Sequence, residues 1–255
     1  MAMTIDDILS VTEHRPWKLP DGNWKFYQEW NNAIFLHWQV DLTSLKQFVP
    51  KELEIDLFEG KPWVSLVAFT MEKIRPRHLP SFPPVSDFDE INIRTYVRSA
   101  DKTGVYFLSI EGGSRLSCKV ARGISGLPYR YSKIARNKGT YFSNNSEYND
   151  HLKLSFSIGK KTEVKNALDS WLTERYALLQ DTESFINNYE IHHLEWPINT
   201  IEMNSLELSY PRFDGLLNNR PDKIQYSAGV KVLAWGRRRT KRLENTDGAV
   251  GICRD

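Results

Sequence analysis

Cysteine is scarce in this sequence, and long apolar runs are missing. The two cysteines, Cys118 and Cys253, form neither a CxxC motif nor a cluster with histidine at the spacing of zinc ligands. We therefore expect two free thiols and no metal site. No apolar run approaches the roughly 20 residues of a membrane-spanning helix. Asp6, Asp7 and Glu13 stand where a signal peptide carries a basic and then an apolar stretch, so we expect a cytoplasmic protein with no membrane partner.

An excess of one charge is also missing, as are the common nucleotide fingerprints. The chain carries 34 Lys and Arg against 32 Asp and Glu, a formal net charge of +2. This balance gives no electrostatic argument for nucleic acid, and the short basic run at 235–242 is typical of a solvated terminus. No segment matches a phosphate loop, a Rossmann fingerprint, a nucleophile elbow or HExxH. We expect no cofactor.

Aromatic residues are abundant and indicate a sheet-rich globular protein. They make up 12% of 255 residues, including 8 Trp, 11 Tyr and 12 Phe. Two helices are predicted, at 42–49 after Asp41 and at 171–179 after Asp169-Ser170. Apolar or alternating runs predict more strands than helices, and these strands cover 33–40, 63–71, 91–98, 105–110, 115–122, 152–158, 189–196, 205–210 and 224–235. The sequence predicts one β-rich α+β domain at 31–235, after an irregular lead-in at 1–30 and before a basic and polar tail at 236–255.

Charged side chains in the alternating strand at 91–98 are the first candidates for function. Glu90 and Arg94 are four positions apart, which places both on one face of an extended strand. One interpretation is an ion pair on the protein surface. The other is a carboxylate and a guanidinium in the wall of an anion-binding cavity. The sequence leaves both open.

A second candidate region is the turn after Arg122. Gly126 and a proline fix a sharp turn there, which presents Tyr129 and Arg130 at a defined place. A simple hairpin turn with an exposed arginine explains the pattern equally well. Tyr129 could donate a hydrogen bond or act as a weak general acid, but a phenol with an ordinary pKa near 10 needs help to do so.

Histidines and carboxylates alternate in the strand at 189–196. Glu190 and His192 share one face, and His193 and Glu195 share the other. Two ligands on a face are too few for a metal site without further help. We therefore expect structural pairs in which a carboxylate orients an imidazole.

Several segments together resemble a known family. They are 90–97, 104–107, 127–129, 171–176, 190–193 with Trp196-Pro197, and 226–230. In this order they are similar to the bacterial YqjF-like family, DUF2071. The resemblance implies the acetoacetate decarboxylase-like fold, in which antiparallel sheets form a double-sheet cone or barrel around a central cavity, with a few peripheral helices.

The resemblance to acetoacetate decarboxylase can be followed along the chain. In that enzyme a lysine forms a Schiff base with the substrate, and a neighbouring cationic group activates it. By resemblance, Tyr129 stands at the position of this lysine and Arg130 at that of its neighbour. The pocket arginine falls at Asn31 and one pocket glutamate at Ser65, whereas Glu90 keeps the other glutamate. Because a phenol cannot form an imine, we do not expect decarboxylation by the covalent route.

The sequence therefore leads to three hypotheses. The first is a cavity that binds a small anionic or carbonyl-bearing molecule. The second is a hydrolase, lyase or isomerase that uses Glu90 and Tyr129 without a Schiff base. The third is an interaction or sensory module with a closed cavity. The resemblance also leaves a homo-oligomer open. The candidate residues are Glu90, Tyr129 and Arg130 for catalysis, and Arg94, Tyr96, Arg122, His192, Asn31 and Ser65 for ligand binding.

Overall fold

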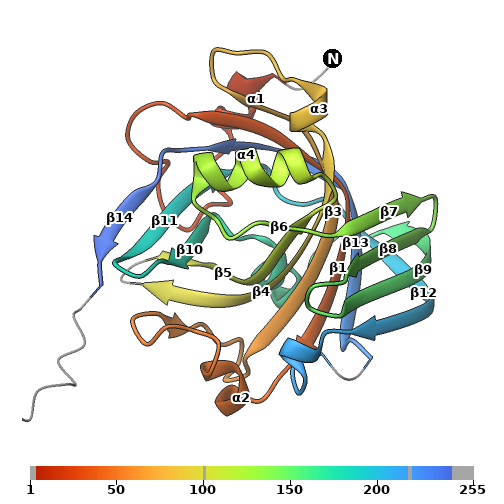
Figure 1. Cartoon of the computed structure of the whole chain (residues 1–255). Helices are drawn as coiled ribbons and strands as arrows, with labels where there is room; N and C mark the ends of the chain where they lie inside the picture. The colour runs from red at the N-terminus through yellow and green to blue at the C-terminus, as the bar shows by residue number, and fades with distance from the viewer. Residues whose placement is uncertain (1–3, 100–101, 218–219, 243–255) are drawn as a thin grey trace, which may run out of the picture.

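Strands form most of the regular structure, as the computed structural model shows for residues 4–99, 102–217 and 220–242 (Figure 1). The strands are β1 (Phe26–Gln39), β2 (Glu54–Ile55), β3 (Trp63–Pro76), β4 (Phe88–Ser99), β5 (Lys102–Gly112), β6 (Arg130–Tyr131), β7 (Lys133–Asn137), β8 (Thr140–Asn145), β9 (Asp150–Lys161), β10 (Ala177–Asp181), β11 (Phe185–His192), β12 (Ile198–Ser209), β13 (Lys223–Ala234) and β14 (Arg238–Lys241). The helices are α1 (Ile5–Ser10), α2 (Leu42–Lys46), α3 (Pro83–Ser86), α4 (Arg115–Ser125) and α5 (Ala167–Thr173), with a short 3-10 helix at Pro211–Phe213. In the described part of the chain no helix has the length and apolar character to cross a bilayer.

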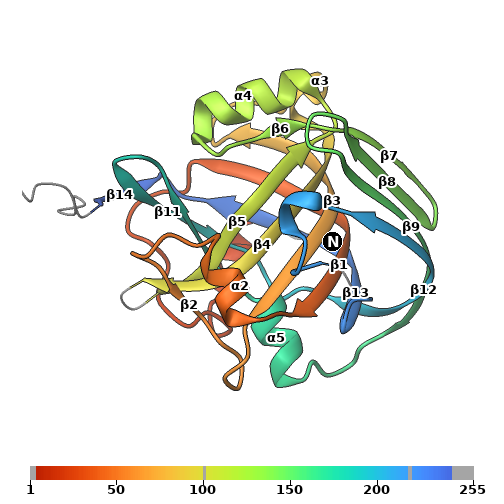
Figure 2. The same cartoon turned by 60° about the horizontal axis from the view of Figure 1, so that its bottom comes forward.

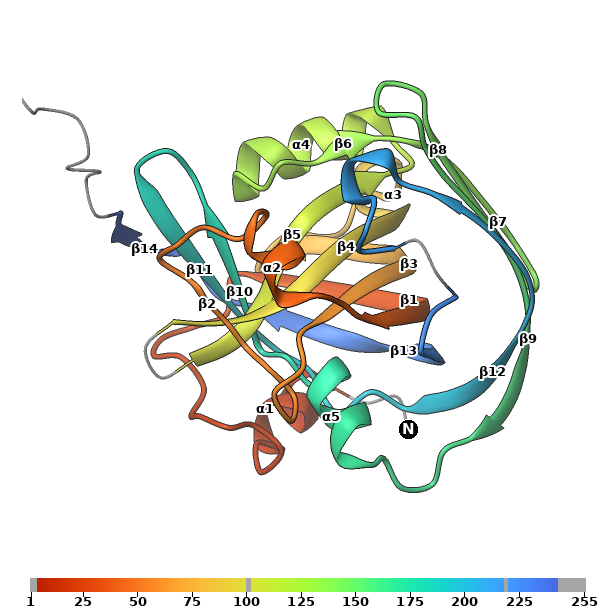
Figure 3. The ribbon, with the colours of Figure 1, turned by 90° about the horizontal axis from the view of Figure 1, so that it is seen from below.

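The strands join into a single sheet that closes on itself. Its order is β14-β11-β10-β5-β4-β3-β1-β13-β12-β9-β8-β7, and β11 also pairs with β13. This additional pairing turns the path from β11 to β13 into a closed ring. Beyond β13, strands β12, β9, β8 and β7 extend the sheet and curve around one side of the ring (Figure 3). The prediction of a cone-like, mostly antiparallel β fold is confirmed.

The ring strands are buried on both faces, which explains their nearly continuous apolar runs. In β1, Phe35 points into the ring and packs in an inner core, while Leu36 points outward into an outer core under the curved extension. We use "inner core" for the cluster that contains Ala33, Phe35, Val67, Phe69, Met71, Phe88, Ile110, Cys118, Leu127, Tyr129, Trp196, Ile198, Val230 and Val232. Strands β1, β3, β4, β5 and β13 contribute buried residues to it, and partly buried residues of β10 and β11 (Leu178, Tyr189 and Ile191) pack against it.

Two helices lie near opposite ends of the ring (Figure 2). Helix α4 packs Cys118 against the inner core, and the loop after it adds Leu127 and Tyr129. At the other end, Leu172 of α5 packs against Tyr96 of β4. Both ends of the ring are therefore near side chains from elements outside the sheet.

The prediction of a strand at 115–122 is wrong, because these residues form α4. The Ser114 side chain accepts a hydrogen bond from Ser117 N, and Gly126 ends the helix with φ at +73°, a conformation that glycine adopts without strain. The run of apolar and polar residues there fits one buried helical face as well as it fits a strand. Local end signals therefore decide the structure of this segment.

The predicted helix at 171–179 is only partly correct. It begins earlier, where Asn166 and Asp169 form a capping box, and it ends at Thr173. Residues 177–181 form β10, which pairs with β11 and lies parallel to β5. Tertiary pairing thus overrides a helical pattern.

The chain ends are more ordered than we predicted, as far as they are described. Helix α1 lies within the segment expected to be irregular, and β1 begins before residue 31. In the tail, β14 pairs with β11. Residues 243–255, including Cys253, lie outside the described residues, and the division into segments at 31 and 235 stays a prediction.

Candidate functional site

Three polar side chains of β4 point into the ring. Glu90, Asn92 and Arg94 alternate along the strand on the face of the inner core, and their exposed fractions are 2%, 3% and 9%. The buried position excludes an ion pair on the surface, and the structure records no ion pair between Glu90 and Arg94 among the described residues. Each of these polar groups therefore needs its own partner in an apolar interior.

Glu90 is hydrogen-bonded to the tyrosine that the sequence analysis singled out. Tyr129 donates its hydroxyl hydrogen to Glu90 Oε2 at 2.7 Å, and Asn92 Nδ2 donates to Oε1 at 3.2 Å. Burial raises the pKa of Glu90 to about 7, although both hydrogen bonds act in the opposite direction. Burial and the nearby carboxylate raise the pKa of Tyr129 well above its usual value. Glu90 can thus give or take a proton near neutral pH, while Tyr129 remains a donor.

The segment after α4 fixes Tyr129 but directs Arg130 elsewhere. Arg122 donates to the backbone carbonyl of Tyr129 from the last turn of α4. Arg130 donates to Ser109 Oγ at 2.8 Å, and its guanidinium lies 4.7 Å from the ring centroid of Tyr148. Neighbouring residues in an extended segment point to opposite sides, so Arg130 is separated from the Glu90 carboxylate. The simple interpretation of an exposed turn arginine is wrong as well, because Arg130 is only partly exposed.

Two buried polar atoms beside this pair have no hydrogen-bond partner in the described part of the chain. They are Asn92 Oδ1 and Arg94 Nε. Arg94 does donate through Nη2 to the carbonyl of Leu172 at 3.2 Å, and its guanidinium lies 5.9 Å from the ring centroid of Phe35. Unsatisfied buried polar atoms are uncommon in native proteins, and they indicate strain or a site for a further group.

A continuous chain of polar contacts continues from Arg94 across the ring. The Tyr96 hydroxyl lies 3.0 Å from the Leu172 carbonyl oxygen and 2.6 Å from Ser65 Oγ. Ser65 Oγ lies 2.6 Å from His37 Nδ1, and His37 Nε2 lies 3.1 Å from Gln225 Oε1. The structure thus brings three candidates, Ser65, Tyr96 and Arg94, into one network.

The sequence analysis missed His37, Gln225 and Asn92. His37 is fully buried in the run AIFLHWQV. A single imidazole among apolar residues has to find partners inside the protein, and this was the available signal. Asn92 shares the polar face of Arg94 by the period of two, whereas nothing in the sequence marks Gln225.

The remaining candidates lie away from Glu90. Asn31 is half-buried and donates to Glu72. His192 contacts Arg15 Nη1 at 3.3 Å and the carbonyl of Ile8 at 2.8 Å. The Asn31 contact joins β1 to β3, and the His192 contacts join β11 to the N-terminal segment.

The predicted pairing of histidines with carboxylates at 190–195 is wrong. Glu190 accepts from Lys102 at 2.5 Å and from Trp17 at 3.0 Å instead. His193 Nδ1 contacts the carbonyl of Leu194 at 2.7 Å. Among the residues that the structure describes, no three His, Cys, Asp or Glu side chains are grouped as metal ligands.

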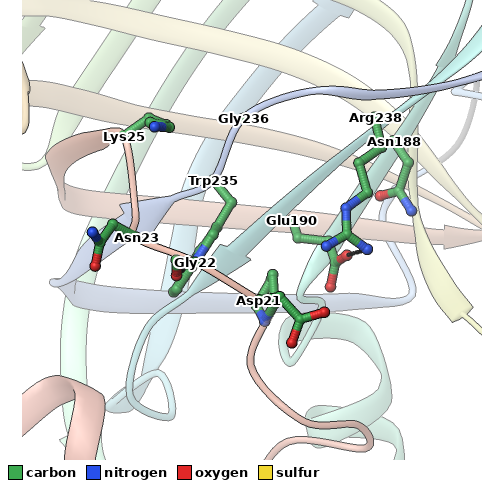
Figure 4. A pocket seen from close by; sticks show the side chains of 10 residues that line it. Asp21, Gly22, Asn23, Lys25, Asn188, Glu190, Trp235, Gly236 and Arg238 are labelled. Atoms are coloured by element: carbon green, nitrogen blue, oxygen red, sulfur yellow. Dashed lines mark hydrogen bonds and ion pairs between the residues drawn. The ribbon is translucent and has the colours of Figure 1, made fainter.

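Two surface cavities of the described residues are lined by other side chains than the predicted site residues. One, of about 250 Å³, lies between residues 20–25, β11 and the segment after β13 (Figure 4). Figure 4 shows Arg238 directed toward Glu190, and their ion-pair distance is 3.9 Å. The other, of about 320 Å³, lies beside α1 and includes Tyr27, Glu29 and Lys73.

The lysines are all outside the buried interior. Every lysine of the sequence falls within the described residues, and none is among the buried ones. Lys133, four positions after Tyr129, is exposed on β7.

Comparisons with known proteins agree with this fold. Residues 27–231 match the model of the DUF2071 family, described as an uncharacterized conserved protein. The chain is 34% identical over 225 residues to uncharacterized protein YqjF from Bacillus subtilis (strain 168), covering 85% of this chain and 93% of that protein.

Solved structures show the same fold at low sequence identity. An acetoacetate decarboxylase-like enzyme from Sphingomonas wittichii RW1 superposes with a TM-score of 0.59 at 13% identity, covering 90% of this chain and 97% of that one. The enduracididine biosynthesis enzyme MppR, complexed with pyruvate, gives 0.58 at 12% identity, covering 88% and 93%. The chain therefore belongs to the DUF2071 family and has an acetoacetate decarboxylase-like fold.

Proposed function

We propose that the inner face of the ring binds a small organic anion that bears a carbonyl group. One observation carries the proposal: the buried Glu90–Tyr129 pair lies on the same face as Arg94, whose Nε donor has no partner among the described residues. A buried guanidinium favours a carboxylate, with which it forms charge-assisted hydrogen bonds. Tyr129 and a protonated Glu90 can donate to a carbonyl oxygen.

The proposed ligand is held without a covalent bond to lysine. Schiff-base formation needs an unprotonated amine beside the substrate, and a lysine supplies it when it is desolvated or next to another cation. No lysine lies in the buried interior, and Tyr129 is a phenol. A small 2-oxo acid has both a carboxylate and a carbonyl. Pyruvate, which one fold neighbour binds, is therefore the first probe.

Proton transfer is a second candidate function for the same residues. The pKa of Glu90 is raised to about 7, which is close to the value that suits a general acid or base at neutral pH. Glu90 would take a proton from a carbon next to the carbonyl, and Tyr129 would donate to the carbonyl oxygen. The product would be an isomer or an elimination product of the oxo acid.

A closed interaction module is favoured by a different observation. Aromatic side chains fill much of the inner core, and Phe35 and Trp196 contact each other at 5.1 Å between ring centroids. If these rings leave no room for a ligand, the function depends on the outer surface. The experiment below separates this possibility from ligand binding.

Native mass spectrometry of freshly purified protein, followed by calorimetry with pyruvate, tests the proposal. We expect either a mass excess that disappears on denaturation or saturable binding of the probe. Arg94→Ala should weaken binding at least tenfold, because it removes the charge that pairs with the carboxylate. Arg98→Ala is the matched control, since Arg98 belongs to the same strand but pairs with Asp56 at 2.6 Å at the edge of the ring. Binding that Arg94→Ala leaves unchanged contradicts the proposal, and a bare mass with no binding favours the closed module.

A further inference from the structure

The polar chain that crosses the ring has two ends that only accept hydrogen bonds. At one end is the carbonyl of Leu172, and at the other is Gln225 Oε1. The orientation of the Gln225 amide is fixed because its Nε2 donates to Asp169 Oδ1 at 2.5 Å. Lys223 also holds this carboxylate, at 2.6 Å. Between the ends lie Tyr96, Ser65 and His37, which are joined by contacts of 2.6 to 3.1 Å.

When His37 is neutral, this series of polar contacts has one hydrogen fewer than it has contacts. Four contacts each need one hydrogen: Leu172–Tyr96, Tyr96–Ser65, Ser65–His37 and His37–Gln225. Tyrosine and serine each supply one, and a neutral imidazole supplies one more. A protonated imidazole supplies two and fills every contact.

The hydrogen bonds between the Leu172 carbonyl and Gln225 therefore have two consistent arrangements, which differ in direction. With neutral His37, Tyr96 donates to Ser65, Ser65 donates to His37 Nδ1, and His37 Nε2 donates to Gln225. The carbonyl of Leu172 is then satisfied by Arg94 alone. With protonated His37 the direction reverses, because Nδ1 donates to Ser65, Ser65 to Tyr96, and Tyr96 to the Leu172 carbonyl.

We propose that the binding of an anion at Arg94 is coupled to the uptake of one proton by His37, passed on by Tyr96 and Ser65. The inference rests on the proposed function, since it takes Arg94 as the anion site. An anion draws the guanidinium away from the Leu172 carbonyl, which then needs the Tyr96 hydroxyl as its donor. The proton enters at Tyr96 oxygen, the Tyr96 hydrogen moves to Ser65, and the Ser65 hydrogen moves to His37 Nδ1. The net event is the binding of one undissociated acid, divided into a carboxylate on Arg94 and a proton on His37.

The charges around His37 also couple its protonation to the binding of an anion at Arg94. Burial, Arg94 on β4 and Lys223 on β13 lower the pKa of His37 to about 3, and the hydrogen bond to Gln225 opposes them. Asp169 on α5 faces the chain through Gln225 and is paired with Lys223. An anion that neutralises Arg94 removes one of the two repulsions, and that of Lys223 remains. The free protein therefore keeps His37 neutral, and an anion on Arg94 raises the pKa of His37 while burial and Lys223 still lower it.

Calorimetry of pyruvate binding in two buffers with different ionisation enthalpies measures this coupling. We expect proton uptake per bound pyruvate that increases as the pH falls from about 8 to about 5. Glu90 could also take a proton when an anion binds. The measurement is therefore repeated in Glu90→Gln, where the uptake by His37 should persist.

Two further variants interrupt the relay while they keep the packing. Ser65→Ala and Tyr96→Phe each remove one hydroxyl and should abolish the proton uptake per bound pyruvate that is seen in the Glu90→Gln background. Uptake that survives both substitutions, or that disappears in Glu90→Gln alone, overturns the relay but leaves the proposed binding site intact. The absence of pyruvate binding to the unmodified protein overturns both the site and the relay. Circular dichroism of each variant confirms that it is folded.

Discussion

Replacing Glu90 by glutamine should change how the stability of the protein depends on pH. Burial raises the pKa of this carboxyl group from an ordinary value of 4.5 to about 7. Below pH 4.5 the group is protonated in both the folded and the unfolded protein, so its titration does not change the free energy of unfolding. As the pH rises to about 7 and above, the unfolded protein has released the proton, and the folded protein must bury a carboxylate. Stability is therefore lost between these two pH values.

The size of the effect follows from the difference between the two pKa values. At about 1.4 kcal/mol for each tenfold change in proton affinity, the penalty reaches about 3 kcal/mol above pH 7. Glutamine has nearly the same shape and never ionises, and its amide oxygen can accept the Tyr129 hydrogen bond. The free energy of unfolding of Glu90→Gln should therefore rise relative to the unmodified protein by about 3 kcal/mol between pH 4 and pH 8.

Urea denaturation of both proteins across this pH range measures the difference, in which the other titrating groups largely cancel. Tyr129→Phe provides a second, opposite test. It removes a hydrogen bond that stabilises the carboxylate, so the pKa of Glu90 rises further and the loss of stability extends to higher pH. A difference between Glu90→Gln and the unmodified protein that stays constant with pH would refute the reasoning, because it would show that Glu90 titrates normally.

Three further predictions concern other parts of the fold. Asp56→Asn leaves the guanidinium of Arg175 buried without its partner at 2.7 Å, and should lower the free energy of unfolding in urea by about 3 to 5 kcal/mol. Gly229→Ala places a methyl group within 2.5 Å of a backbone oxygen at a residue with φ of +136°, so its melting temperature should fall by several degrees; an unchanged value would contradict the local geometry. Burial raises the pKa of the Cys118 thiol to about 11, so in a Cys253→Ala protein an aromatic disulfide reagent should react quickly only after urea is added, and rapid reaction without urea would argue against this burial.

The sequence predicted which residues of β4 share a face, but it did not predict that the polar face is buried. Glu90 and Arg94 do share a face, as the period of two predicts. Their burial depends on the ring that β11 and β13 close, and this pairing joins segments more than 40 residues apart. No local pattern reports such a closure. The resemblance to a family supplied the fold, whereas the residues alone left a surface ion pair as a valid alternative.

The partner of Glu90 became predictable only through the family resemblance. Tyr129 comes from a segment 39 positions later in the chain, and nothing in the spacing links the two. In the same way, His37 looked like one more member of an apolar strand, because its partners lie on β3 and β13. Helix α4 shows the reverse error, because the sequence contains its local end signals, Ser114 and Gly126, and the prediction of a strand there did not use them.

The two outer strands of the sheet, β14 and β7, influence how strongly the protein resists aggregation at high concentration. An unpaired strand exposes backbone donors and acceptors to which a strand from another molecule can add, and this is a common route to aggregation. Here β14 consists of four exposed residues, Arg-Arg-Thr-Lys, and β7 begins with an exposed lysine. A second copy that approached along either strand would bring cation against cation. The positive charges of β14 therefore disfavour the addition of a strand from another molecule. Neutralising these charges should promote fibrous assembly without changing the packing inside the ring.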